Sequence, residues 1–224
     1  MLIAFSGAEL RDGDQRRGAG GAKAGSASTP KSLARTCSAR PAPAIGDNVP
    51  GGERLNMSTT AAAPPPMVAQ FLQTFGMEHA TTLRVLKAVP GDKLSFKPHE
   101  RSFSAGELAW HIAYSQLGLA KFIVTHDFAS YQQPPVPASI EEIVAGSEKF
   151  HNEACEVISR LTQEQLAATI PLPGGKSVPA SGMLWGAVLF HQIHHRGQLS
   201  VYIRMTGGKV PSIYGPSGDD NPFA

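Results

Sequence analysis

The stretch His191-Gln192-Ile193-His194-His195-Arg196-Gly197-Gln198 lies within residues 181–205, a segment whose pattern predicts a long helix. Three of the eight histidines of the chain fall within five positions there. Residues four apart in an α-helix lie one turn apart on nearly the same face. His191 and His195 can therefore direct two imidazoles at one point, and neutral imidazole is a common ligand of transition metals.

The same four-residue spacing occurs in the His-Glu-x-x-His zinc helix of metalloproteases. Gln192 stands where that motif has glutamate, so the general base is missing and a metalloprotease is not favoured. A catalytic metal site usually takes three protein ligands and keeps an open position. The two histidines therefore predict a third ligand elsewhere in the chain.

Composition divides the chain at about residue 66. Residues 1–66 contain no histidine, are rich in Gly, Ala, Ser, Pro and Arg, and show no helical or strand period. We expect a disordered tail there, because such a composition cannot bury enough apolar surface. Gly51-Gly52-Glu53 can be encoded by a sequence resembling a bacterial ribosome-binding site, so we expect translation to start at Met57 and the preceding residues to be an over-extended gene prediction.

Residues 67–224 are expected to form one domain, and their composition excludes several functions. They carry 12 Lys and Arg against 13 Asp and Glu without a basic stripe, so no nucleic acid is expected as a partner. The longest apolar run, Met183–Phe190, is too short to span a bilayer, so no membrane is expected either. Cys37 and Cys155 suggest neither a disulfide scaffold nor a thiolate cluster, which fits a bacterial cytoplasm.

Four long amphipathic segments predict an all-α fold, a four-helix bundle. Ser104 and Glu107 form a capping-box pattern at the start of the second segment. A small hairpin is expected around Gly174-Gly175, and an irregular segment is expected at the C-terminus. The helices are expected at about residues 67–89, 104–126, 139–161 and 181–205, the hairpin at 170–179 and the irregular segment at 209–224.

The third ligand is expected from a facing helix, where bundles place their metal sites. His111 follows Trp110 in the middle of a predicted helix, and a polar ring there is costly without a partner. His79 lies on the apolar stripe of the first helix and is the runner-up. His151 is expected on a solvated face, since Lys149 and Glu153 flank it.

Three motifs, in this order, resemble those of the DinB/YfiT-like family. They are Trp110-His111-Ile112-Ala113, His191 to Gln198, and Val210-Pro211-Ser212-Ile213-Tyr214-Gly215. The resemblance covers residues 67–224 and implies a four-helix bundle, often homodimeric. It also implies a divalent metal held by three histidines, which map to His111, His191 and His195. The family name derives from DNA-damage induction, which implies a role in the stress response.

The resemblance implies one divalent transition metal, which could be zinc, nickel, iron or manganese, and a small-molecule substrate. Related proteins use low-molecular-weight thiols, so a thiol S-transferase is favoured, with the thiol as cosubstrate. The alternatives are a metal-dependent hydrolase and a non-catalytic module that binds a metal or a stress ligand. Glu107 and Gln198 are weak catalytic candidates, and Cys155 is interpreted as a small buried hydrophobe.

Overall fold

The structure is a computed structural model that describes residues 63–127, 131–172 and 174–223. The predictions of a disordered tail and of a translation start at Met57 concern residues that, apart from 63–66, lie outside this described part. They remain predictions.

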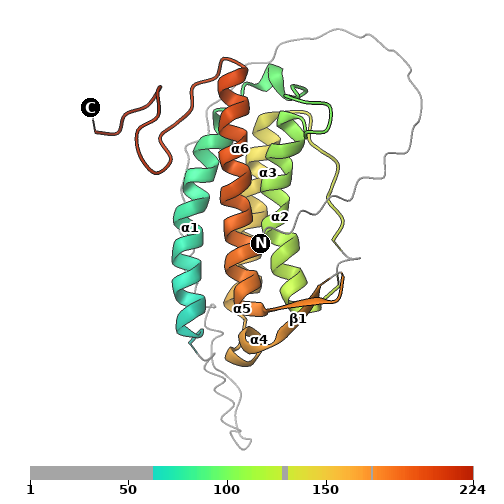
Figure 1. The fold of residues 1–224 in the computed structure, drawn as a ribbon. Coiled ribbons are helices and arrows are strands. Elements are labelled where there is room, and N and C mark those ends of the chain that lie inside the picture. The colour runs from blue at the N-terminus through green and yellow to red at the C-terminus, as the bar shows by residue number, and fades with distance from the viewer. Residues whose placement is uncertain (1–62, 128–130, 173, 224) are drawn as a thin grey trace, which may run out of the picture. The chain divides into compact units, whose positions relative to one another are not determined.

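Four long helices lie side by side and form the predicted all-α bundle (Figure 1). α3 packs against α1 and α2, and α6 packs against the same two helices from another side. Their interior contains fully buried apolar side chains from every helix, including Phe75, Ile112, Ile143 and Leu199. The four helices are α1 (Pro66–Lys87), α2 (Ala105–Thr125), α3 (Ile140–Ser159) and α6 (His191–Met205).

Side-chain caps determine where several of these helices begin. The predicted capping box of α2 is present: the backbone N–H of Glu107 donates to Ser104 Oγ, at 3.1 Å, and Glu107 Oε2 accepts from the Ser104 N–H, at 2.6 Å. Thr162 and Gln165 form the same pair at the short helix α4 (Gln163–Ala167). Each box satisfies N–H groups that have no partner within the helix.

The last predicted helix, residues 181–205, is divided into three pieces. α5 (Ala180–Met183) is followed by a π-helix, η2 (Leu184–Phe190), and only then by α6. A π-helix is wider than an α-helix, and short π segments often occur at functional sites. Here the π segment ends immediately before His191. It therefore determines the direction in which the first side chains of α6 point.

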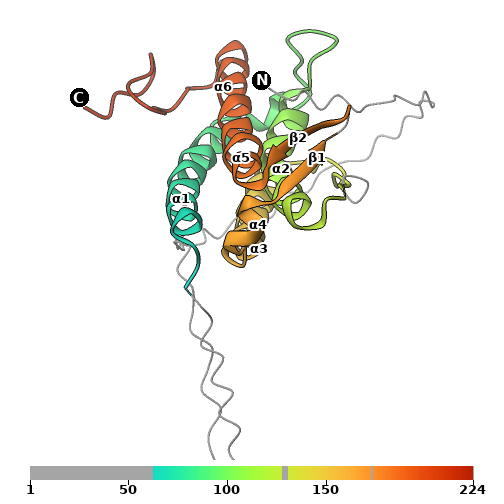
Figure 2. The same ribbon diagram turned by 60° about the horizontal axis from the view of Figure 1, so that its bottom comes forward.

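The expected hairpin is present at one end of the bundle (Figure 2). β1 (Thr169–Leu172) and β2 (Lys176–Pro179) are antiparallel, with Thr169 opposite Pro179 and Leu172 opposite Lys176. Gly174 and Gly175 in the turn have φ angles of 80° and 71°, which glycine adopts at little cost. Among the described residues, no helix has the length and hydrophobicity to cross a bilayer.

Candidate metal centre

Three histidines from two facing helices converge, as the sequence predicted. His191 and His195 lie one turn apart in the first half of α6, and His111 faces them from α2. The Nε2 atom of His191 is 3.3 Å from Nε2 of His111 and 3.0 Å from Nε2 of His195. One ligand atom from each ring lies within 4.8 Å of the other two. We refer to these residues as the three-histidine cluster.

The donor atoms of the three-histidine cluster have the spacing that a metal ion requires. Zinc–imidazole bonds of about 2.0–2.1 Å at tetrahedral angles place two nitrogens about 3.3 Å apart. His191 Nε2 is at about that distance from both neighbours, and a single N–H could donate to only one of them. The cluster therefore fits a metal ion better than it fits a set of hydrogen bonds between the rings.

Gln198 fixes the orientation and tautomer of His195. Nδ1 of His195 donates to Oε1 of Gln198 at 2.7 Å, so the proton resides on Nδ1 and the lone pair of Nε2 points into the cluster. Metal-binding histidines generally have such a partner on the second ring nitrogen. Gln198, a weak catalytic candidate from the sequence, is therefore placed to orient a ligand.

Burial keeps the three imidazoles neutral, which is the form that binds metal. Burial, followed by the charges of its histidine neighbours, lowers the pKa of His191 to about 3. The pKa of His111 falls to about 4 through burial and the charge of His195, against an opposing hydrogen bond with Gln133. Burial also lowers the pKa of His195, although its bond to Gln198 opposes the shift.

Comparison with known proteins identifies the family. The model of the DinB family matches residues 57–221. The chain belongs to the DinB family. It is 28% identical over 155 residues to the protein YrdA of Bacillus subtilis (strain 168), an alignment that covers 67% of this chain and 89% of YrdA.

Two solved DinB-like structures share the fold. One, from Bacillus cereus ATCC 10987, has a TM-score of 0.56 and 28% identity, covering 65% of this chain and 97% of that one. YjoA from Bacillus subtilis has a TM-score of 0.51 and 28% identity, covering 64% and 93%. The family and the bundle that the sequence motifs implied are thus confirmed.

The two other histidines weighed as ligands, His79 and His151, lie apart from the three-histidine cluster. His79, the runner-up, is buried in α1, where its ring stacks on that of His151 with centroids 3.8 Å apart. The expectation that His151 lies on a solvated face is wrong: its side chain is only 5% exposed, because α3 turns it towards α1. His194 is exposed beside the cluster.

Glu107 is engaged in its structural role. Its carboxylate accepts from the Ser104 N–H and lies 3.5 Å from the Lys97 ammonium. The Ser104 bonds and Lys97 lower the pKa of Glu107, so the group is a carboxylate at neutral pH. Its capping bonds account for its presence at this position.

A strap formed by residues 131–134 also reaches the cluster, and it was not predicted from the sequence. Gln133 hydrogen-bonds the ring of His111. The neighbouring Pro134 carbonyl accepts from Trp110 Nε1 at 2.8 Å, and Tyr131 packs where Gly118 leaves room: a Cβ at Gly118 would lie 1.9 Å from the Tyr131 ring. One signal for the strap was available in the sequence: a buried indole N–H, here that of Trp110, needs a hydrogen-bond acceptor.

Arg196, which follows the cluster in sequence, serves to position α6. Its guanidinium is 1% exposed and donates to Glu78 Oε2 and to Tyr214 OH, each at 2.7 Å. Tyr214 donates to the same carboxylate oxygen at 2.8 Å. These bonds join α6, α1 and the C-terminal segment, which explains why the motif containing Tyr214 accompanies the histidine motif.

Proposed function

We propose that the protein is a metal-dependent enzyme that transfers a low-molecular-weight thiol to a small electrophilic substrate. In this proposal His111, His191 and His195 hold one divalent transition metal. The observation that carries it is the convergence of three neutral imidazole Nε2 atoms at metal-ligand spacing. Three nitrogen donors suit zinc, nickel or iron better than manganese, which prefers oxygen ligands.

A divalent ion held by three neutral ligands keeps its full charge and supplies Lewis acidity, which lowers the pKa of a thiol or a water. The residues of the chain provide the orientation. Gln198 holds the ring of His195, and Gln133 contacts that of His111. Phe103 stacks on His111 with ring centroids 5.5 Å apart and is 44% exposed, which provides an apolar wall for a substrate.

The alternative enzyme is a hydrolase, which the same ligand set supports because three neutral imidazoles also suit activation of water. A non-catalytic module that binds a metal or a stress ligand is the remaining alternative. Purified protein is first analysed for bound metal and then assayed with small electrophiles, with and without a thiol and with and without a chelator. Thiol-dependent, chelator-sensitive conjugation supports the transferase.

The other outcomes of this assay separate the alternatives. Chelator-sensitive turnover that needs no thiol would favour the hydrolase. Stoichiometric metal without turnover in either assay would favour the binding module. His194→Ala is the matched control, since it removes an exposed neighbouring imidazole and leaves the three converging nitrogens in place.

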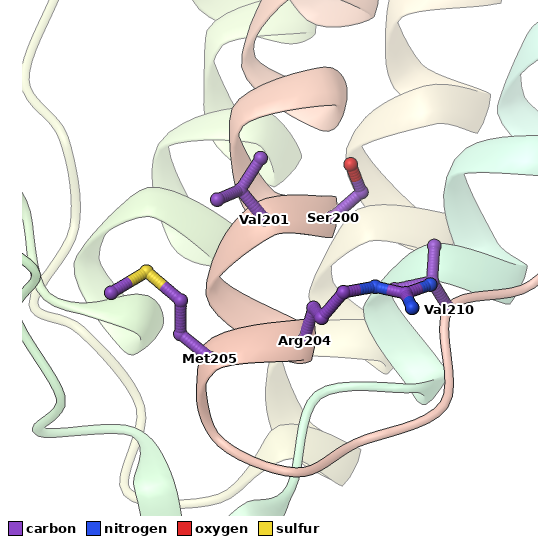
Figure 3. Close-up of a pocket in the computed structure, with 5 residues that line it drawn as sticks. All are labelled: Ser200, Val201, Arg204, Met205 and Val210. Carbon is purple, nitrogen blue, oxygen red and sulfur yellow. The ribbon is translucent and has the colours of Figure 1, made fainter. Parts of the chain in front are cut away.

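We further propose that the protein forms a homodimer through the outer face of α6. Val201 and Met205 are each 56% exposed there and line a shallow hollow with Ser200, Arg204 and Val210 (Figure 3). Exposed apolar side chains that adjoin on one helix favour association, and a two-fold pair uses the same face on both copies. Val201→Glu is expected to shift the mass measured by light scattering from dimer to monomer. A monomeric wild type at micromolar concentration would contradict the proposal.

A further inference from the structure

A second group of polar side chains lies inside the bundle, apart from the three-histidine cluster. Each of the four long helices contributes to it, and every member is at least nine-tenths buried. We refer to it as the inner polar cluster. Its members are His79 on α1, Gln116 on α2, His151 and Cys155 on α3, and Gln192 on α6.

The orientation of the Gln116 amide is fixed by the backbone. Its Nε2 donates to the carbonyl of Ala113 at 2.9 Å and to that of Ser147 at 3.2 Å. Both amide hydrogens are thereby used, so Oε1 is the atom that faces the other members. Gln192 Nε2 donates to this oxygen at 3.3 Å.

The direction of the remaining bonds follows from this orientation. His151 Nδ1 lies 3.2 Å from Gln116 Oε1, and because an amide oxygen can only accept, Nδ1 carries the proton. Nε2 of His151 then has a lone pair, and it lies 3.5 Å from the sulfur of Cys155. The thiol therefore donates to the imidazole, and the order of groups is thiol, imidazole, amide oxygen.

This order is the one that activates cysteine nucleophiles in enzymes, where the imidazole takes the thiol proton and an amide holds the imidazole. We propose that Cys155 is a modification site, a thiol that His151 deprotonates and that a small peroxide such as hydrogen peroxide oxidises to a sulfenic acid. The site is separate from the metal centre and shares no residue with it.

An amide oxygen and two aromatic rings hold the His151 ring in place. Gln116 Oε1 accepts from Nδ1, and the Phe75 ring lies 4.4 Å away. His79 stacks on the other side at an interplanar angle of 1°. Burial, followed by the charge of His151, lowers the pKa of His79 to about 2.

His79 provides an independent indication that a small polar molecule enters this region. Its ring is 6% exposed, and neither of its nitrogens has a hydrogen-bond partner within the described part of the chain. A neutral imidazole has one donor and one acceptor, and leaving either unpaired in the interior costs about 1–3 kcal/mol. Water and hydrogen peroxide can each satisfy both.

The step balances without further reactants. The Cys155 proton moves to His151 Nε2, and the thiolate sulfur attacks one oxygen of the peroxide. The S–O bond forms as the O–O bond breaks, which oxidises the sulfur and reduces the peroxide. The leaving hydroxide takes the proton back from His151 as water, and the product is Cys155 sulfenic acid.

Burial restricts the oxidant to a small, uncharged molecule. The Cys155 side chain is only 8% exposed, so bulky disulfides and charged reagents cannot reach the sulfur in the folded protein. Hydrogen peroxide is close to water in size and hydrogen bonding. A folded protein is therefore expected to react with peroxide while it excludes a large alkylating reagent.

The test treats the folded full-length chain with hydrogen peroxide, removes the excess peroxide with catalase, and then unfolds the chain in the presence of dimedone, which traps sulfenic acid. Peptide mapping by mass spectrometry assigns the adduct to Cys155 rather than Cys37. At about pH 6, where an ordinary thiol is protonated, we expect Cys155 to react at least about tenfold faster than N-acetylcysteine. Cys155→Ser must lack the adduct.

His151→Phe, which preserves ring packing beside His79 and Phe75, is expected to slow the reaction at least about tenfold. An unchanged rate in this variant, or oxidation of Cys155 only when denaturant is present during the peroxide treatment, would overturn the proposal. If the variant does not fold, the wild-type pH profile decides. A rate that persists well below the ordinary thiol pKa of about 8.5 supports the proposal, and a profile parallel to that of N-acetylcysteine overturns it.

Discussion

The bundle contains two groups of histidines, and their ring orientations differ. In the three-histidine cluster the rings cross at 79°, 88° and 87°. Crossed rings can aim their nitrogens at one point. In the inner polar cluster, the rings of His79 and His151 are parallel, and stacked imidazoles direct their nitrogens outward side by side. Ring orientation, more than proximity, therefore distinguishes the two clusters.

The two clusters also differ in their access to solvent. The three ligand candidates are partly exposed, with the exposed His194 beside them, whereas His79 and His151 are 6% and 5% exposed. Solvent therefore reaches the first cluster directly, whereas the second is closed to all but small molecules.

The largest effect is expected from His191→Ala, since His191 Nε2 contacts both other donors. Loss of an outer hydrogen-bond partner typically costs 10–100-fold in metal affinity, so loss of the central ligand is expected to cost more than about a hundredfold. Competition titration with a chelating dye measures the change. His151→Leu, from the inner polar cluster, should retain wild-type affinity; a loss there comparable to that of His191→Ala would remove the distinction.

A smaller loss is expected for Gln198→Ala. The His195 ring would lose the acceptor that fixes its tautomer, and affinity is expected to fall about 10–100-fold. Gln198→Glu keeps an acceptor at this position and should recover most of the loss in the same titration. Equal affinities for all three proteins would show that the 2.7 Å bond does not orient the ligand.

The buried His79 of the inner polar cluster is expected to make the free energy of unfolding depend on pH. The pKa of His79 is about 2 in the folded protein against an ordinary value of 6.5, so the unfolded chain binds the extra proton. The contribution of His79 to the free energy of unfolding is fully present above pH 6.5. It is lost as the pH falls below that value, by up to about 1.4 kcal/mol per pH unit. Urea unfolding of metal-free protein at several pH values should show a shallower slope for His79→Phe. Equal slopes of unfolding free energy against pH for the wild type and His79→Phe would contradict the burial of a neutral His79.

The smallest effect is expected for metal binding on mild acidification. Protons compete for a ligand only below its pKa, and the pKa values of His191 and His111 are about 3 and 4. Affinity should therefore change by less than about twofold between pH 7 and pH 6, whereas a histidine peptide weakens across that range. Isothermal titration calorimetry in both buffers tests this. A tenfold fall would indicate that the imidazoles titrate like solvated ones.

Several features of fold and site were determined by local sequence. The pairing of Ser104 with Glu107 depends on residues three apart and set the start of α2. The alignment of His191 with His195 follows from helical periodicity, and the cost of a polar ring on an apolar helix singled out His111. Such inferences need only the geometry of one helix and the hydrophobic pattern along it.

Other features depended on contacts between helices. Charged neighbours in sequence suggested a solvated His151, but packing of α3 against α1 buried it beside His79. The π-helix before His191 and the strap that brings Gln133 to His111 likewise left no periodic signal. Periodicity fixes which face a side chain occupies on its own helix. Only the packing of several helices decides whether that face meets solvent, the three-histidine cluster or another ring. The free energies of burial and of side-chain contact that decide this arise between residues far apart in sequence.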